Sequence, residues 1–448
     1  MRLREAFRRF GALSSVTFSL LSQAAIARAG EVPSPSTDAE LAGKVDRASL
    51  ERIAVARDPQ LKAAAHRIRS IVAQGASEGS IPPPDFMAQI WQVPLARPLA
   101  FADAGMIMLG LSQSFPAIGS LSSKEDARKH EARAEAAMLA GATLDLVRHV
   151  DHAYVDYVSA VARRRIHVDH QRLLERMDDL ARARQSTGGS LLDVAQAEAE
   201  LARLAAEVGA ESIIVETARA RLNGLLARDP GAPLGEPAEE APTTVRLPTK
   251  ELVTRAEAAR PELKAAEEKR EAALSQARSA EREATIPSFS IAALYFAPVG
   301  PMPAHGWGAN LSVSLPWLWG SRSSAAESQR EAAEAERDTS AGARVRARTE
   351  VATAVGSARE QEQRYGILQA RALPATRRAL EAAQAGYASN RTPLSSVLSA
   401  ERAVVDVELE VILARAALEH ALVDLDWAAG GRLPRQSIPR AEGDPHVH

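Results

Sequence analysis

Two identical tetrapeptides are the residues of this chain whose types and spacing best suit chemistry. The sequence His-Val-Asp-His occurs at residues 149–152 and again at residues 167–170. An offset of 18 residues is five helical turns, so both copies fall on one helix face. Histidines at i and i+3 can share a metal ion, but the two pairs would lie about 27 Å apart on a helix and neither has an obvious third ligand. We therefore expect contacts with solvent or neighbouring helices here, and predict no metal site and no cofactor.

Other catalytic chemistry has no support in the sequence. The 448 residues include no cysteine, which excludes a thiol nucleophile, a thiolate zinc site and a disulfide framework. The sequence has no nucleophile–base constellation, phosphate-binding loop, dinucleotide fingerprint or metalloprotease motif. A formal net charge of -2 gives no basic surface for nucleic acid. The sequence therefore predicts a protein that is not an enzyme.

Very long helices must position these residues. Residues 117–229 contain no proline, as long helices require. One helix is predicted over about residues 122–186 and a second over about 191–228, separated by the sequence TGGS. In the second helix, nine of ten positions at alternating 3-4 spacing between residues 194 and 225 are apolar, which is typical of a coiled-coil seam.

The chain is a tandem duplication. The coiled-coil pattern recurs 203 residues later, with all ten positions between residues 397 and 428 apolar. Other segments recur in the same order at offsets of 200 to 203: PQLKAA at 59–64 as PELKAA at 261–266, LSQSFP at 111–116 as LSVSLP at 311–316, and LLDVAQAE at 191–198 as LSSVLSAE at 394–401. We place the first repeat at residues 30–228, a linker at 229–249 and the second repeat at 250–430, with long helices at about 322–389 and 394–428.

Both ends of the chain differ from the repeats. Residues 1–29 have the basic start, the apolar stretch and the A-x-A cleavage site of an export signal peptide. Residues 431–448 show no periodicity, and we expect a flexible tail there. No stretch approaches the ~20 apolar residues of a membrane helix.

Each repeat carries a strand-like insert, at about residues 85–115 and 288–315. Ten of the 18 aromatic residues lie between 85 and 115 or between 288 and 319. Partial alternation of apolar and polar residues predicts a two-stranded hairpin in each insert. Strand length and aromatic content favour a transmembrane β-barrel over the alternative, a soluble sheet that caps a coiled coil. The residues expected at the membrane interface are Phe86, Trp91, Phe289, Tyr295, Phe296 and Trp307.

Four strands cannot close a barrel in one chain. Unpaired strand edges in lipid cost several kcal/mol for each polar group, so closure must occur between copies. Two copies would give eight strands and three would give twelve; an eight-stranded barrel is filled by its own side chains, so a conduit favours three. The predicted fold is mainly α with a membrane β-barrel portion. Duplicated long-helix hairpins form an α-barrel, and four strands per chain contribute to a trimeric 12-stranded barrel.

The duplication, the hairpin-in-helix order and the paired motifs resemble the TolC-like outer-membrane efflux proteins over about residues 40–430. The opening DPQL at 58–61, followed by PPP at 82–84, is most similar to the heavy-metal efflux branch. The resemblance implies a homotrimeric exit duct of a tripartite efflux system in the bacterial outer membrane, extending into the periplasm. It passively conducts small molecules or metal ions delivered by an inner-membrane pump, with the resistance-nodulation-division type favoured, and a periplasmic adaptor protein. Alternatives are the duct of a type I protein secretion system and a soluble periplasmic coiled-coil adaptor or scaffold.

The resemblance also assigns the two inter-helix turns to the periplasmic tip, where the adaptor contact and the gate lie. Many family members carry carboxylates in the second turn. The corresponding positions here are Ser396 and Ser399, which puts an acidic gate in doubt and leaves Asp193 as the carboxylate of the first turn. The tip residues implied are Thr187, Gly188, Gly189, Leu191, Asp193, Asn390, Arg391, Thr392, Pro393, Leu394, Ser396 and Ser399.

Overall fold

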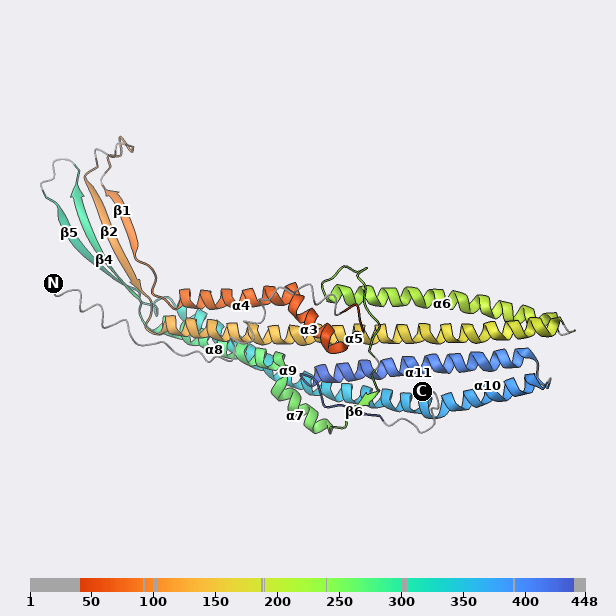
Figure 1. Cartoon of the computed structure of the whole chain (residues 1–448). Helices are drawn as coiled ribbons and strands as arrows, with labels where there is room; N and C mark the ends of the chain where they lie inside the picture. The colour runs from red at the N-terminus through yellow and green to blue at the C-terminus, as the bar shows by residue number, and fades with distance from the viewer. Residues whose placement is uncertain are drawn as a thin grey trace, which may run out of the picture.

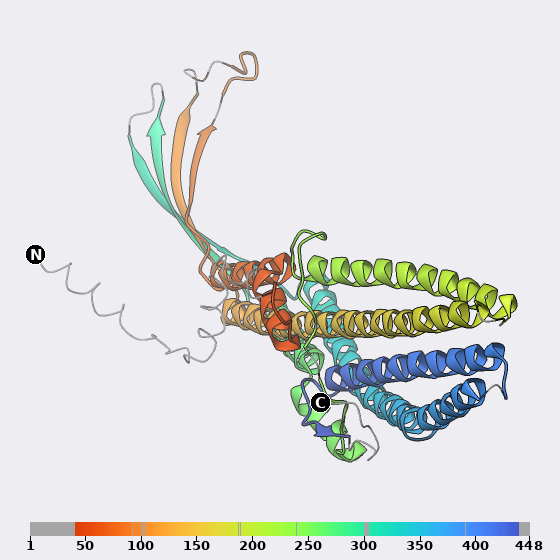
Figure 2. The ribbon, with the colours of Figure 1, turned by 45° about the vertical axis from the view of Figure 1, so that its right-hand side comes forward.

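The computed structural model describes residues 41–438, apart from positions 92, 100, 102, 103, 187, 189, 239, 300–303 and 390. The signal peptide predicted at residues 1–29 lies outside the described residues. The described chain is elongated, with a sheet at one end and paired long helices that run to the other end (Figure 1). Figure 2 shows that the sheet is curved and projects away from the ends of the helices. None of the described helices is both long and apolar enough to cross a membrane.

The two repeats share one order of elements. The first repeat contains α3 (Arg47–Arg57), α4 (Pro59–Glu78), β1 (Asp85–Trp91), β2 (Met106–Phe115), α5 (Ser120–Gln185) and α6 (Leu191–Leu225). The second contains α7 (Thr249–Ala259), α8 (Pro261–Thr285), β4 (Phe289–Pro298), β5 (Gly306–Val313), α9 (Ser321–Ile367), a π-helical turn (Leu368–Ala372), α10 (Leu373–Ala388) and α11 (Leu394–Ala428). Two short strands, β3 (Thr243–Thr244) and β6 (Gln436–Ser437), pair with each other.

Local sequence explains where the longest helix of the first repeat begins and ends. Gly119 precedes α5 with a φ of 80°, a left-handed conformation that glycine adopts without strain. The 66 residues of α5 extend for about 100 Å. Arg182 and Arg184 lie in its last turn, where positive charge favours the helix dipole. The Ser190 side chain accepts a hydrogen bond from the backbone N–H of Leu192 and caps α6.

The corresponding helix of the second repeat is interrupted, which differs from the single helix predicted over about residues 322–389. A π-helical turn at Leu368–Ala372 separates α9 from α10 and ends two residues before Pro374. Proline has no N–H to donate, and its ring clashes with the carbonyl group four residues earlier. The wider turn accommodates that ring, so the chain continues in helix beyond it.

The four long strands form one antiparallel sheet in the order β1-β2-β4-β5, as the predicted two hairpins require. One face of the sheet is apolar and exposed; it carries Phe86, Leu111, Ile291, Tyr295 and Leu311, among others. The opposite face is more buried and more polar; it includes Gln89, Ser112, Ser290, Asn310 and Ser312. We call these the outer face and the inner face.

Three hydrophobic clusters lie among the helices. One belongs to the first repeat and is centred on Leu50, Tyr154 and Leu222. The second belongs to the second repeat and includes Val351 and Leu418. The third joins the two repeats at the tip and positions the candidate site; its members are Leu174, Ala181, Val194, Ala197, Leu204, Tyr387, Leu394, Val397 and Leu398.

Residues 431–438 after α11 pack against the second repeat and the linker, in contrast to the flexible tail expected from residue 431. Leu433 is buried in the core of the second repeat, and its N–H donates to Asp426. Arg435 donates to the same carboxylate at 2.7 Å, and β6 then pairs with β3 of the linker. We call residues 431–438 the strap. Apolar periodicity does not reveal it, because single anchoring residues hold it in place.

Candidate functional site

The first turn of the tip joins α5 to α6. Gly188 adopts a φ of 97° and has open space around its Cα, while Thr187 and Gly189 lie outside the described residues. Leu191 follows the turn and is 67% exposed, although it is a large apolar residue at a helix start. Leu192 beside it is exposed to a similar extent. The first turn therefore presents a small apolar surface at the end of the molecule.

The second turn folds back closely onto α10. The backbone N–H groups of Arg391 and Thr392 both donate to the carbonyl of Gly386. A Cβ at Gly386 would meet Oγ1 of Thr392 at 2.7 Å, so this contact requires glycine. Arg391 and Pro393 are exposed, and Asn390 lies outside the described residues.

Side chains from both repeats meet between the two turns. The Tyr387 hydroxyl of α10 donates to the Asp193 carboxylate of α6 at 3.4 Å. The Arg184 guanidinium lies 4.2 Å from the centre of the Tyr387 ring, a cation–π contact. A cleft of about 350 Å³ lies here, lined by these residues and by Arg391 and Thr392. Arg184 and Tyr387 are equivalent positions at the 203-residue offset, so the repeats meet at the tip through matching positions.

A buried carboxylate provides a second link between the two repeats, further along the helices from the tip. Glu200 of α6 is almost fully buried and accepts from Nε of Arg402 on α11 at 2.9 Å. Arg203 donates to the same carboxylate at 3.1 Å. Burial raises the pKa of Glu200, but the hydrogen bonds from the two arginines outweigh it and lower the pKa to about 2. The link is therefore ionised at any physiological pH.

The predicted tip residues are not all placed alike. Ser396 and Ser399 are exposed, Asp193 and Thr392 are half-buried, and Leu394 is fully buried in the cluster that joins the repeats. Sequence reasoning missed Tyr387, Glu200 and Arg402. Tyr387 could have been noticed as one of the few aromatic residues outside the inserts, whereas a Glu or Arg within a charged helix gives no such signal.

The predicted interface aromatics lie toward the two ends of the strands. Phe86 and Phe289 lie at the ends nearest the helices, and the Phe289 ring lies 4.9 Å from that of Phe115. Trp91, Tyr295, Phe296 and Trp307 lie toward the far ends. The register puts Phe86, Phe289, Tyr295 and Trp307 on the outer face, and Trp91 and Phe296 on the inner face.

The repeated tetrapeptides point mainly toward the other repeat. His149 is exposed, whereas His152 and His170 both contact α11. Nδ1 of His170 lies 2.6 Å from Glu401 and Nε2 lies 3.1 Å from Glu408. Among the described residues, no three His, Asp or Glu side chains are arranged to surround a metal ion.

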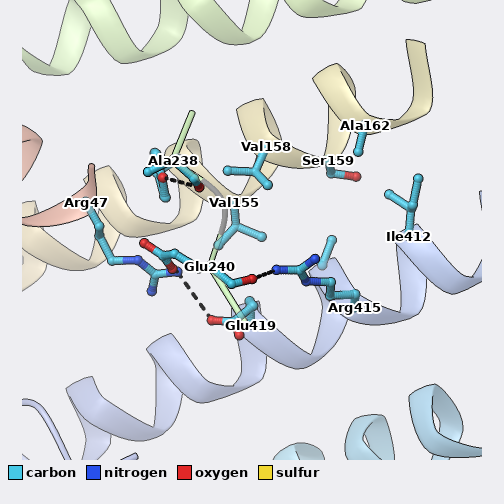
Figure 3. A pocket seen from close by; sticks show the side chains of 12 residues that line it. Arg47, Val155, Val158, Ser159, Ala162, Ala238, Glu240, Ile412, Arg415 and Glu419 are labelled. Atoms are coloured by element: carbon cyan, nitrogen blue, oxygen red, sulfur yellow. Dashed lines mark hydrogen bonds and ion pairs between the residues drawn. The ribbon is translucent and has the colours of Figure 1, made fainter. Parts of the chain in front are cut away.

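A pocket between α5, α11 and the linker is shown in Figure 3. Arg47 donates to Glu240 and Glu419 at its edge, over an apolar floor that includes Val155 and Ile412. Its volume of about 60 Å³ is close to that of two water molecules. The pocket is much smaller than the cleft at the tip, so it is not a candidate substrate site.

A sheet with an apolar outer face, continuous with duplicated pairs of very long helices, is the arrangement that the sequence predicted for one subunit of an outer-membrane channel. Residues 252–431 match the family model described as Outer membrane efflux protein. Over 86% of this chain, the fold matches VceC from Vibrio cholerae (20% identity, 96% of that chain, TM-score 0.70) and CusC (19%, 92%, 0.72). It also matches the open state of MtrE from Neisseria gonorrhoeae (21%, 89%, 0.69) over the same share of this chain. No curated protein matches the sequence significantly.

These matches confirm that the chain resembles the TolC-like outer-membrane efflux proteins. Its location is the outer membrane, with the helices extending into the periplasm.

Proposed function

We propose that three copies of this chain form the passive exit duct of a tripartite efflux system. The observation that carries the proposal is the direction of the two edge strands. Since each neighbouring pair in the order β1-β2-β4-β5 is antiparallel, β1 and β5 run in opposite directions. The β5 edge of one copy can therefore pair antiparallel with the β1 edge of the next, and three copies would close a 12-stranded barrel.

The two faces of the sheet support this closure. The exposed apolar outer face suits lipid, while serine, glutamine and asparagine side chains on the inner face suit a water-filled lumen. A soluble adaptor or scaffold would leave the apolar face in water, which argues against that alternative. The duct itself carries out no chemistry, and energy comes from a pump.

The tip supports docking of a periplasmic adaptor protein. Leu191 and Leu192 are exposed next to the first turn, where a partner would cover them. Asp193–Tyr387 and Glu200–Arg402 hold the two helical hairpins together, and we propose that their separation opens the duct. We favour a pump of the resistance-nodulation-division type; the duct of a type I protein secretion system is the alternative, and the class of pump encoded beside the gene distinguishes them.

Cross-linking tests the number of copies. The chain has no cysteine, so Ala88→Cys in β1 can be combined with Ala309→Cys or Leu311→Cys in β5 without background. Oxidation in outer-membrane fractions should give covalent trimers, and single-cysteine variants serve as controls. Products that stop at dimers, or recovery of the protein in the soluble periplasmic fraction without detergent, would overturn the proposal.

A further inference from the structure

Two histidines from different repeats face each other halfway along the molecule. Nδ1 of His152 on α5 lies 2.6 Å from Nδ1 of His420 on α11. The ring centres are 4.8 Å apart and the ring planes differ by 27°. The centre-to-centre distance exceeds the nitrogen separation by nearly two ring radii, so both Nδ1 atoms lie close to the line that joins the centres. The two nitrogens therefore meet head-on.

A carboxylate lies next to the Nε2 atom of each ring. Nε2 of His152 lies 2.9 Å from Asp424, and Nε2 of His420 lies 3.1 Å from Asp156. Arg148 donates to Asp424 at 2.8 Å, and Arg221 donates to Asp156 at 3.3 Å. Carboxylates paired with arginine are ionised and only accept hydrogen bonds, so each Nε2 carries the hydrogen.

The hydrogen on Nε2 determines what each Nδ1 presents. In a neutral imidazole, the nitrogen without hydrogen carries a lone pair. Two such lone pairs at 2.6 Å repel each other unless a cation, either a proton or a metal ion, lies between them. Histidines that bind metals are oriented in this way, with the second nitrogen donating to a carboxylate.

We propose that His152 and His420 bind a divalent cation of the zinc class through their two Nδ1 atoms, with water as the remaining ligands. Tetrahedral zinc with bonds of about 2.0–2.1 Å requires the two nitrogens to move apart by several tenths of an ångström and the head-on rings to turn, so that both lone pairs point at the ion. Small side-chain rotations supply this movement, since the side chains are 26% and 29% exposed and water reaches them. The ion would tie the first repeat to the second through α5 and α11, independently of what the duct conducts.

The second tetrapeptide provides an internal control. His170 occupies the position that His152 has in the first copy, but both of its nitrogens lie against carboxylates, Glu401 and Glu408. No second histidine faces it in these contacts, so its ring offers no nitrogen to a metal. His149 is exposed and precedes His152 by three residues, which makes it a second control.

Calorimetric titration of the full-length, untagged protein in detergent with zinc chloride tests the site. Every protein tested also carries His446→Gln and His448→Gln, so that the terminal histidines cannot bind zinc. We call this doubly substituted protein the background protein. One ion per chain should bind, and His152→Gln or His420→Gln should each weaken binding at least tenfold. Asp424→Asn should weaken binding by about 10- to 100-fold, as loss of a carboxylate behind a metal-bound histidine does.

Two outcomes would overturn the proposal. One is the absence of stoichiometric zinc binding, which would mean that only a shared proton lies between the rings. The other is binding that persists in both His152→Gln and His420→Gln. His149→Gln and His170→Gln should bind zinc as the background protein does. Circular dichroism and gel filtration of each variant show that folding and assembly are retained, and two independent histidine variants guard against misfolding of either one.

Discussion

Arg402 of α11 donates a hydrogen bond from Nε to Oε1 of Glu200 on α6 across 2.9 Å, and the two residues belong to different repeats. Near the tip, this ion pair and the Tyr387–Asp193 hydrogen bond are two polar links between the two helical hairpins. If the duct opens at its tip, the two hairpins must either separate and break these contacts or move together and keep them. The arrangement therefore predicts that weakening the ion pair favours the open state.

Arg402→Gln should increase the single-channel conductance or open probability of the purified duct in planar bilayers. Because the Arg402 side chain is half exposed, the loss of stability should be modest, about 1 kcal/mol. Arg337→Gln is the control, since Arg337 pairs only with the exposed Glu334 on its own helix α9 in the contacts described. Equal conductance of wild type and Arg402→Gln would show that this pair does not restrain the tip.

Gly188 tests the docking role of the first turn. Its φ of 97° disfavours a side chain, but no atom lies close enough to block one, so Gly188→Arg should fold with some local strain. A bulky charge here, as at Gly189, should abolish export while trimers persist. Drug or metal susceptibility of cells and gel mobility of the trimer measure the two effects. Gly209→Arg, in an equally open position within α6, should export normally; export by Gly188→Arg would argue against the tip assignment.

The helices and hairpins could be predicted from sequence because their signals are periodic. A 3-4 apolar spacing marks α6 and α11, and the repeat offset matches their starts at Leu191 and Leu394. Apolar and polar alternation in β5 likewise marks a strand with two different faces. These patterns depend on neighbours in the chain, so one sequence is enough to show them.

Contacts between the repeats could not be predicted in this way. His152 and His420 are separated by 268 residues, and which histidine faces which depends on the rotation of α5 against α11. The tetrapeptide spacing predicted only that His152 contacts solvent or a neighbouring helix, and it gave no signal that His420 is the residue it meets. The strap held by Arg435 and Asp426 was missed for the same reason, because a single long-range ion pair leaves no periodic signal.

The two sheet faces predict opposite effects for neighbouring residues of β2. Leu111 lies on the outer face and is 55% exposed, whereas Ser112 lies on the inner face. Leu111→Arg would put a charge in lipid at a cost of about 2–4 kcal/mol near the membrane centre, so the protein should fail to insert. Ser112→Arg should insert and form trimers, with a narrowed lumen. Insertion is measured as the heat-dependent gel mobility of the protein in outer-membrane fractions. Equal behaviour of the two variants would contradict the assignment of the faces.

The His170 contacts predict a loss of stability at alkaline pH. Burial lowers the pKa of His170, but the hydrogen bonds to Glu401 and Glu408 outweigh it and raise the pKa from 6.5 to about 9. Because the folded-state pKa is the higher one, the stabilisation is fully present below pH 6.5 and is lost as the pH rises through about 9. Protonated His170 therefore contributes at most about 3 kcal/mol to the free energy of unfolding.

Thermal unfolding between pH 6 and pH 10 measures this effect. The midpoint of the wild type should fall by several degrees over that range, and His170→Gln should start lower and change less, since glutamine cannot carry the charge that both carboxylates require. His149→Gln, which alters an exposed histidine of the same helix, should keep the slope of the wild type. An unchanged slope in His170→Gln would mean that the ion pairs between α5 and α11 contribute nothing to holding the two repeats together.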